Sequence, residues 1–293
     1  MAKKVQFAHT WVPYVFIAPQ LLIIGVFFFW PALQALYLSF MLEDPWGLSS
    51  TFVWFENYQT LFTSADYLST TLFTLGYSFA VVVLSLGIAL ILAVKANAVL
   101  HGQKTYRLLL TWVYAVAPAV AGITAYFLFN RHIGVFYDAI VSTGWLFAPE
   151  TSTFDATVLL ILVSVWKQIP VNFVFFLAGL QSIPVTVREA AQMDCESPTR
   201  RFWTITFPLL APTAFFLMVI NITYAFFDTF GLIDTLTQGR PAGSTSTMVY
   251  KVYQDGFLGA DLGLSSAQSV VLMILVMALV MVQFRFVERR IHY

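Results

Sequence analysis

Charged residues are scarce in this chain. Of its 293 residues, only 10% are Asp, Glu, Lys or Arg, whereas soluble domains carry about 25%. The hydrophobic share is 59%, which excludes an ordinary soluble domain and predicts an integral membrane protein. The 15 basic and 15 acidic residues balance, so there is no basic excess for binding nucleic acid.

Three kinds of chemistry also lack their residues. The single cysteine, Cys195, cannot form an internal disulfide. The P-loop motif G-x-x-x-x-G-K-[ST] is missing, so any ATP and magnesium that drive this protein would bind to another chain. The four histidines, His9, His101, His132 and His292, fall in predicted loops or tails without the spacing of zinc ligands. We therefore expect neither a metal site nor a cofactor on this chain.

One short segment could suggest an enzyme. Residues 263–265 read Gly-Leu-Ser, a G-x-S pattern that six-helix intramembrane serine proteases also contain. Such a protease needs a base within hydrogen-bond reach of the serine, usually a histidine. Because no predicted span contains histidine, we interpret the segment as the small-residue entrance to the last helix and the chain as a non-enzyme.

Long apolar segments predict six transmembrane helices. A helix needs about 20 mainly apolar residues to cross roughly 30 Å of hydrocarbon. Five segments contain no charged residue, and the sixth contains only Lys167. The segments cover residues 5–42, 67–94, 108–130, 156–180, 202–227 and 262–284. The sequence thus predicts an all-α membrane protein in which a first helix, residues 12–40, stands apart from a core of five helices.

The distribution of charge predicts the orientation. With the amino terminus inside, only Arg131, Arg240 and Lys251 are basic residues of the outer loops. The basic residues of the inner loops and tails are Lys3, Lys4, Lys95, Lys104, Arg107, Arg188, Arg200, Arg201, Arg285, Arg289 and Arg290. Because inner loops of membrane proteins are enriched in Lys and Arg, both termini are predicted to be cytoplasmic. The outer connections, about residues 41–69, 131–155 and 228–265, are long enough for short surface helices.

The inner loop at residues 181–208 is the most informative segment. Pro184 can begin a helix because its fixed φ suits the first turn, and residues 185–193 fit a helix of about two turns. Pro198 blocks its continuation, and Pro208 and Pro212 flank the entrance to the fifth span.

On this short helix, Glu189 borders a flat strip formed by Ala190 and Ala191. Small residues let another backbone approach closely, and the carboxylate can pair with a basic partner. Periodicity alone leaves two interpretations open, a docking surface for another protein and an amphipathic connector that rests on lipid headgroups.

The sequence of this loop resembles a known family. Glu-Ala-Ala-x-x-Asp at residues 189–194, followed by Arg200, Phe202, Ile205, Pro208 and Pro212, is similar to the EAA loop of the permeases of binding-protein-dependent ABC importers. The similarity extends over nearly the whole chain, including residues 114–120, 164–168, 224–230 and 267–273. Within the carbohydrate-uptake group of this family, the chain looks most like permeases for sn-glycerol-3-phosphate.

The resemblance implies a type I ABC importer permease fold in the bacterial inner membrane. The chain would form half of a path for a small phosphorylated polyol or sugar, working by alternating access. Its partners would be a second homologous permease, two ATP-binding subunits, a periplasmic solute-binding protein and membrane lipid. The implied division is a tail, first helix and periplasmic loop at residues 1–68, a permease core at 69–286 with the coupling loop at 181–208, and a tail at 287–293.

The match to the motif also implies site residues. Glu189, Ala190, Ala191 and Asp194 would sit in a cleft of one ATPase, with Arg200 as a flanking contact, and would pass on the closure of that subunit as a rigid-body motion. One position departs from the pattern. The family usually has glycine after the Asp, which can end a helix in a left-handed conformation, whereas this chain has Cys195. Either the turn is built differently or strain is tolerated.

Lys167 is the only charged residue inside a predicted span and lies near its middle. An unpaired lysine there costs about 2.5 to 3.5 kcal/mol on insertion scales, so it should face the bundle, a cavity or a partner. It could contact a phosphate of the solute, or it could make a structural ion pair or carbonyl contact. The other polar candidates for the path are Gln168, Asn172, Asn221 and Tyr224.

A secondary transporter of a small polar solute is the alternative function. Such a protein usually contains an internal repeat with paired broken helices. The six predicted spans show no convincing repeat.

Overall fold

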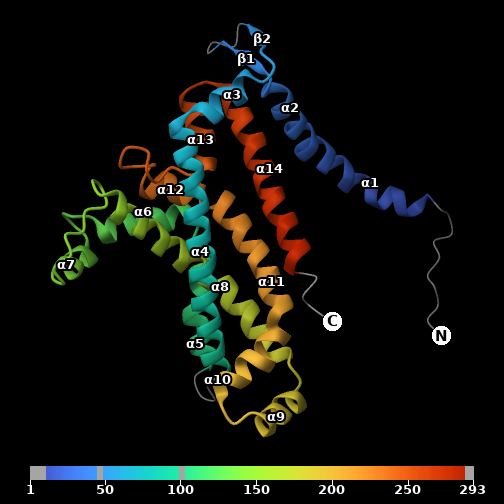
Figure 1. Ribbon diagram of the computed structural model, residues 1–293, viewed down its shortest axis with the longest axis vertical. Coiled ribbons are helices and arrows are strands. Elements are labelled where there is room, and N and C mark those ends of the chain that lie inside the picture. Colours follow the sequence, from blue (N-terminus) through green and yellow to red (C-terminus); the bar gives the residue numbers. More distant parts are fainter. Residues whose placement is uncertain (1–10, 45–48, 99–102, 288–293) are drawn as a thin grey trace. The chain divides into compact units, whose positions relative to one another are not determined.

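The computed structural model describes residues 11–44, 49–98 and 103–287 (Figure 1). The predicted charged tail residues Lys3, Lys4, Arg289 and Arg290, and the histidines His9, His101 and His292, lie outside the described residues. The chain forms two compact units. The first comprises Met1–Thr63 and Val252–Val271, and the second comprises Ser64–Lys251 and Leu272–Tyr293.

An apolar helix of 27 residues begins the first unit. It consists of α1 (Val12–Ile24), a π-helical segment η1 (Gly25–Phe29) and α2 (Trp30–Leu38), and none of these residues is buried. The wider π turn lies in the turn before Pro31, where the proline ring would otherwise crowd the helix. The helix matches the predicted first span.

A small hairpin follows this helix. Strand β1 (Met41–Glu43) pairs antiparallel with β2 (Ser50–Phe52), with Met41 opposite Phe52. The buried Asn57 side chain, on helix α3 (Glu56–Thr63), donates to the carbonyls of Ser39 at 3.0 Å and Met41 at 2.9 Å. The helix agrees with the predicted surface helix, but the hairpin was not predicted, because strands of three residues are too short to show an alternating pattern.

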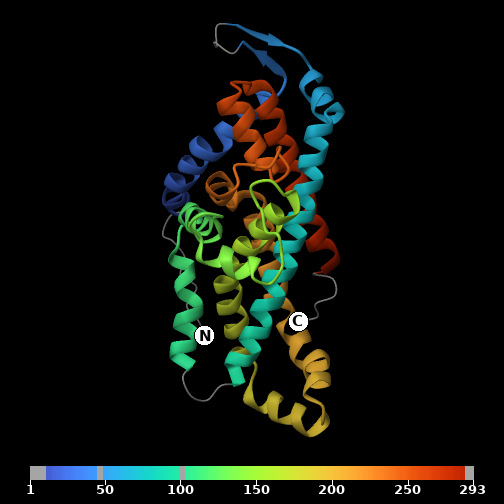
Figure 2. The same ribbon diagram turned by 90° about the vertical axis from the view of Figure 1, so that its left-hand side faces the viewer.

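The second unit is a helical core built on α4 (Ala65–Ala98), α8 (Thr153–Ser182) and α11 (Phe207–Thr223), which pack against one another (Figures 1 and 2). Its shorter elements are α5 (Gln103–Thr111), η2 (Trp112–Ala115), α6 (Pro118–Phe129), α7 (Val135–Val141), α9 (Val185–Asp194), α10 (Pro198–Arg201), η3 (Phe202–Thr206), η4 (Tyr224–Asp228) and α12 (Phe230–Leu236). Three further elements, α13 (Met248–Tyr253), η5 (Gln254–Leu258) and α14 (Leu262–Val287), complete the described chain.

The third predicted span is a broken helix. Arg107–Ala115 and Pro118–Phe129 meet at an angle of 105°. Val116 and Ala117 between them are extended, with ψ of 123° and 146°. The residue before a proline is pushed out of the helical region, and Pro118 has no N–H to continue the helix. Five helices of the described chain are long and apolar enough to span a membrane, and the predicted number of six is reached when this bent pair counts as one span.

The fifth predicted span begins earlier than expected. The helical stretch runs from Pro198 to Asp228 through α10, η3, α11 and η4. The preceding short helix already ends at Asp194, and Pro198, predicted to block its continuation, begins the next helix. Pro208 and Pro212 lie inside the span and do not flank its entrance. The π-helical turn η3 precedes Pro208, and the N–H of Phe207 bonds to the carbonyl of Phe202 there.

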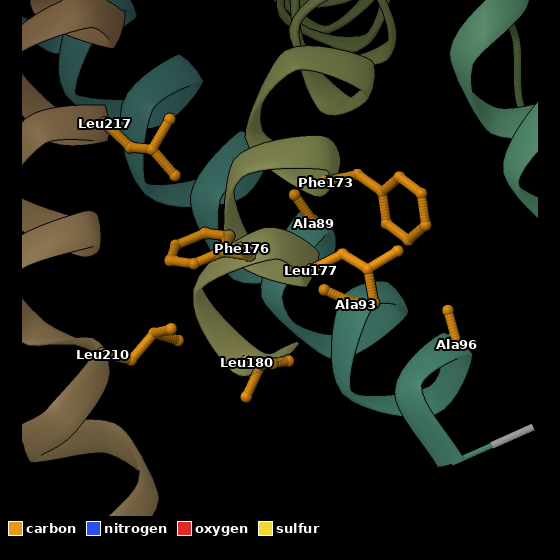
Figure 3. Packing of buried hydrophobic residues seen from close by; sticks show 9 residues of the cluster. All are labelled: Ala89, Ala93, Ala96, Phe173, Phe176, Leu177, Leu180, Leu210 and Leu217. Atoms are coloured by element: carbon orange, nitrogen blue, oxygen red, sulfur yellow. The ribbon is translucent and has the colours of Figure 1, made fainter. Parts of the chain in front are cut away.

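Side chains from three helices form a hydrophobic cluster at one end of the core (Figure 3). Helix α4 contributes alanines, which let the backbones approach closely, while α8 and α11 contribute larger side chains. The buried members are Ala89, Ala93, Ala96, Phe173, Phe176, Leu177, Leu180, Leu210 and Leu217. Since α8 continues from this cluster towards α9, the short helix is attached to a tightly packed region.

Candidate functional site

Helix α9 lies between the end of α8 and the beginning of α10 (Figure 1). Its observed bounds agree with the predicted helix at residues 185–193. Of the predicted docking residues, Glu189, Ala190 and Asp194 are exposed on α9, and Arg200 is exposed on α10. None of the three charged side chains forms an ion pair with another described residue. Their charges are therefore available to another chain.

Ala191 differs from its neighbours. Only 5% of its surface is exposed, so it faces the core and does not extend the exposed strip as the sequence predicted. The reason is the helical repeat, which turns adjacent residues through about 100°. Ala191 helps to line a cavity of about 410 Å³ behind α9, together with Leu180 at the end of α8 and Leu209 of α11. The small side chain leaves room between α9 and the core.

The turn after α9 is built without glycine. Cys195 has φ of −131° and ψ of 110°, which is extended backbone that any residue adopts. Its N–H still bonds to the carbonyl of Ala191 at 3.2 Å. The departure from the family pattern is thus accommodated by a different turn, with no residue in the left-handed region.

Lys167 lies at the middle of α8, with 8% of its surface exposed. Its Nζ donates to the main-chain carbonyl of Tyr114 at 3.3 Å and lies 5.6 Å from the centre of the Tyr114 ring. In an uninterrupted helix that carbonyl would accept from residue 118, but Pro118 has no N–H. Lys167 therefore supplies the hydrogen bond that the proline cannot make.

This geometry bears on the two roles that the sequence left open for Lys167. The carbonyl contact is present, and no carboxylate forms an ion pair with Lys167 in the described part of the chain. A contact with the phosphate of a solute stays a prediction.

Asn172 and Asn221 form a closed polar cluster between α8 and α11, and both are fully buried. The Asn172 Nδ2 donates to Asn221 Oδ1 at 3.0 Å, and the Asn221 Nδ2 donates to Asn172 Oδ1 at 2.6 Å. Ser85 of α4 also donates to Asn221 Oδ1, at 3.0 Å. Ser85 was not predicted, because a serine inside an apolar helix gives no signal of its partner. The cluster joins the three main helices of the core.

The remaining two candidates for the solute path, Gln168 and Tyr224, are also buried in the core. Only 5% and 7% of their surfaces are exposed, and the Tyr224 hydroxyl has no hydrogen-bond partner among the described residues. The neighbouring Tyr77 hydroxyl pairs with Ser164 Oγ at 2.6 Å. Buried polar groups normally have hydrogen-bond partners. Because the Tyr224 hydroxyl has none among the described residues, it can still bond to water or a ligand.

No group of three or more His, Cys, Asp or Glu that could hold a metal occurs among the described residues. The charged and polar side chains described above suit docking and helix packing.

Known proteins with similar sequences are permeases of membrane transport systems. Residues 45–293 match the family described as binding-protein-dependent transport system inner membrane component. The sn-glycerol-3-phosphate transport system permease protein UgpA of Rhizobium meliloti is 50% identical over 291 residues, covering 99% of each chain. The protein of that name from Yersinia pestis is 47% identical over 287 residues, covering 98% of this chain and 97% of its own length.

Solved structures show the same fold. A chain of a bacterial ABC transporter that imports the acidic polysaccharide alginate superposes with a TM-score of 0.83 at 19% identity, covering 96% of each chain. A second structure, of the alginate transporter with a pentasaccharide-bound periplasmic protein, gives 0.80 at 21% identity, covering 95% of this chain and 94% of its own. Together with the family match and the exposed loop helix, these likenesses show that this chain is a multi-pass inner membrane permease of the binding-protein-dependent transport family.

Proposed function

We propose that this chain forms half of the translocation path for sn-glycerol-3-phosphate, or a related small phosphorylated polyol or sugar, in an ATP-driven importer. The observation that carries the proposal is the 50% identity, over 99% of both chains, to a permease whose name states that solute. A secondary transporter loses its support, because membership of this family implies dependence on a binding protein.

The proposed complex contains this chain, a second homologous permease, two ATP-binding subunits and a periplasmic solute-binding protein. ATP and magnesium bind to the ATP-binding subunits. Helix α9 docks in a cleft of one of them, where exposed Glu189, Asp194 and Arg200 can pair with charges of the partner. Exposed Ala190 lets the partner backbone approach closely. Both termini and the α9 loop then face the cytoplasm, in agreement with the positive-inside distribution.

The packing next to α9 supports a role in transmitting motion. Ile183, directly before α9, is buried, and Leu180 belongs to the hydrophobic cluster with Leu210 of α11. Close-packed interiors move as bodies, so displacement of α9 by a closing ATPase would carry the ends of α8 and α11 with it. Such a rigid-body movement of the helices would open the solute path alternately to the two sides of the membrane.

For the solute path, the five candidates divide into two groups. Asn172, Asn221 and Lys167 already use their polar groups within the chain. The Tyr224 hydroxyl has no hydrogen-bond partner among the described residues, and Gln168 is buried next to Lys167 in the chain. We therefore assign the polar contacts with the solute inside the path to Tyr224, with Gln168 as the second candidate, and the positioning of the helices to the other three.

Reconstitution of the complete importer in liposomes tests the proposal. With ATP inside and the binding protein outside, sn-glycerol-3-phosphate should accumulate, and glycerol should not. Accumulation without ATP or without the binding protein would contradict the importer mechanism. Equal uptake of glycerol, or uptake of an unphosphorylated sugar alone, would contradict the assignment of the solute.

A further inference from the structure

A cavity of about 460 Å³ lies near the amino-terminal end of α8, the opposite end from α9. Its lining comes from α6, α7, α8 and α12 and from the segments after α6, before α8 and after α12. It shares no lining residue with the five path candidates. All of its residues belong to the second unit, so the cavity is a feature of one compact part of the chain.

Two arginines line this cavity. Arg131 and Arg240 are far apart in the sequence, yet both line it. The third basic residue that the sequence places in the outer loops, Lys251, is ion-paired with Asp66 at 2.8 Å. The cavity is therefore lined by both of the arginines that the sequence places in the outer loops.

Most N–H groups of the two guanidinium groups make no hydrogen bond to another described residue. Arg240 donates one hydrogen bond, to Gln238 Oε1 at 2.8 Å, and the Arg131 side chain donates none to another described residue. Glu150 also lines the cavity, but it forms no ion pair with either arginine in the part of the chain that the structure describes. Since each guanidinium carries five N–H donors, several remain free for a ligand.

The rest of the lining suits a small polar molecule. Tyr126 and Tyr137 contribute aromatic rings with hydroxyl groups, and Phe129 and Phe147 pack with ring centres 6.1 Å apart. The Thr237 hydroxyl is buried and has no hydrogen-bond partner among the described residues. Small-molecule sites typically occupy about 300 to 1,000 Å³ and combine apolar walls with a few polar groups.

We propose that this cavity is an anion-binding site at which Arg131 and Arg240 hold the phosphate group of a phosphorylated polyol. The planar fork of arginine pairs with phosphate oxygens bidentately, and two forks match the charge of a phosphate monoester better than one. The identity of the solute rests on the proposed function, whereas the preference for phosphate rests on the arginines. The site lies at the predicted periplasmic end, where solute enters, and is separate from the contacts assigned to Tyr224.

Direct binding to the purified importer tests this site. The assembled complex, without its binding protein, is placed in phosphatidylcholine nanodiscs and titrated with inorganic phosphate, sn-glycerol-3-phosphate and glycerol. The doubly substituted Arg131→Gln, Arg240→Gln complex is compared with Lys251→Gln, which removes a charge from the same predicted face outside the cavity. We expect both phosphates to bind, glycerol not to bind, and the double variant to bind phosphate at least about tenfold more weakly. Lys251→Gln should match the wild type.

The outcomes separate this site from the transport proposal. Equal phosphate affinity in the wild type and the double variant, or no binding to the wild type, overturns the site even if the solute is imported. Arginine-dependent binding supports the site even if the wild type fails to import sn-glycerol-3-phosphate. An esterified phosphate also occurs in phosphatidylglycerol, so the titration is repeated in nanodiscs that contain this lipid. Arginine-dependent retention of the lipid without binding of the soluble phosphates overturns the assignment to solute.

Discussion

The exposed α9 loop and the buried polar cluster of the core use polar residues in opposite ways. On α9 and α10, Glu189, Asp194 and Arg200 face outward and have no ion pair within the described chain. Between α8 and α11, Asn172 and Asn221 are fully buried and exchange two hydrogen bonds. Unused charges at a surface are available for another protein, whereas mutually satisfied amides hold helices together. Substitutions in the two regions should therefore damage different properties.

Reversal of the Glu189 charge should have the largest effect. In Glu189→Lys, we expect the chain to insert normally, while its assembly with the ATP-binding subunit becomes weak or is lost. Truncating one partner of a charge pair in an interface costs at least about 2 kcal/mol, so solute-stimulated ATP turnover should fall at least about thirtyfold. The measurement is ATP turnover by the reconstituted complex with loaded binding protein.

The matched control is Glu196→Lys, which reverses an exposed charge just after the helix. This variant should retain most of its turnover. Unchanged turnover in Glu189→Lys, or equal loss in both variants, would argue against a specific coupling contact at Glu189.

Tight helix packing within the core should be the next most sensitive feature. A Cβ added to Gly122 of α6 would collide with Thr235 Oγ1 and lie 3.0 Å from the carbonyl of Leu232, both on α12. Gly122→Ala should therefore destabilise the protein by about 1 to 3 kcal/mol. Gly87→Ala on α4 has no neighbour within 4 Å and should be neutral or stabilising. Reversible denaturation in detergent measures both, and equal stability of the two variants would contradict the close approach.

The paired asparagines should give a smaller and non-additive effect. Asn172→Leu or Asn221→Leu alone leaves the other amide buried without its partner, which costs about 1 to 2 kcal/mol in a membrane helix. Replacing both should cost less than the sum of the single changes. A double-mutant cycle in the same denaturation assay measures the coupling. Strict additivity would show that the two side chains do not depend on each other.

Lys167→Gln should have the smallest effect. Glutamine can still donate to the carbonyl of Tyr114, so we expect only a few-fold loss of transport, of similar size for phosphorylated and unphosphorylated solutes. Uptake of both kinds of solute by proteoliposomes measures it. Selective loss of the phosphorylated solute would instead assign phosphate recognition to Lys167.

The α9 loop could be predicted from the sequence because its signals are local. Pro184, Pro198 and the Glu-Ala-Ala-x-x-Asp pattern lie within a few residues of one another, and the observed helix agrees with them. The burial of Ala191 could not be predicted, because it depends on which side of α9 faces α8 and α11.

Features that depend on distant residues were missed or only partly predicted. Apolar length gave the spans, but it did not show that the third is bent by 105° before Pro118. The hydrogen bond from Ser85 to Asn221 joins residues 136 positions apart, and no local pattern signals it. That Arg131 and Arg240 line one cavity likewise depends on the packing of α6 and α12. Most of the helices, including α9, could thus be predicted from the sequence, whereas tertiary packing decided the polar contacts.

The bond between Lys167 and the Tyr114 carbonyl has a consequence for how the protein is made. During synthesis the broken third span enters the membrane first, with a main-chain carbonyl that Pro118 leaves without its helical partner. Lys167 arrives later, in the next span, and an unpaired lysine is itself unfavourable in lipid. Each segment therefore carries a defect that the other corrects, and we expect the two to leave the insertion machinery as a pair.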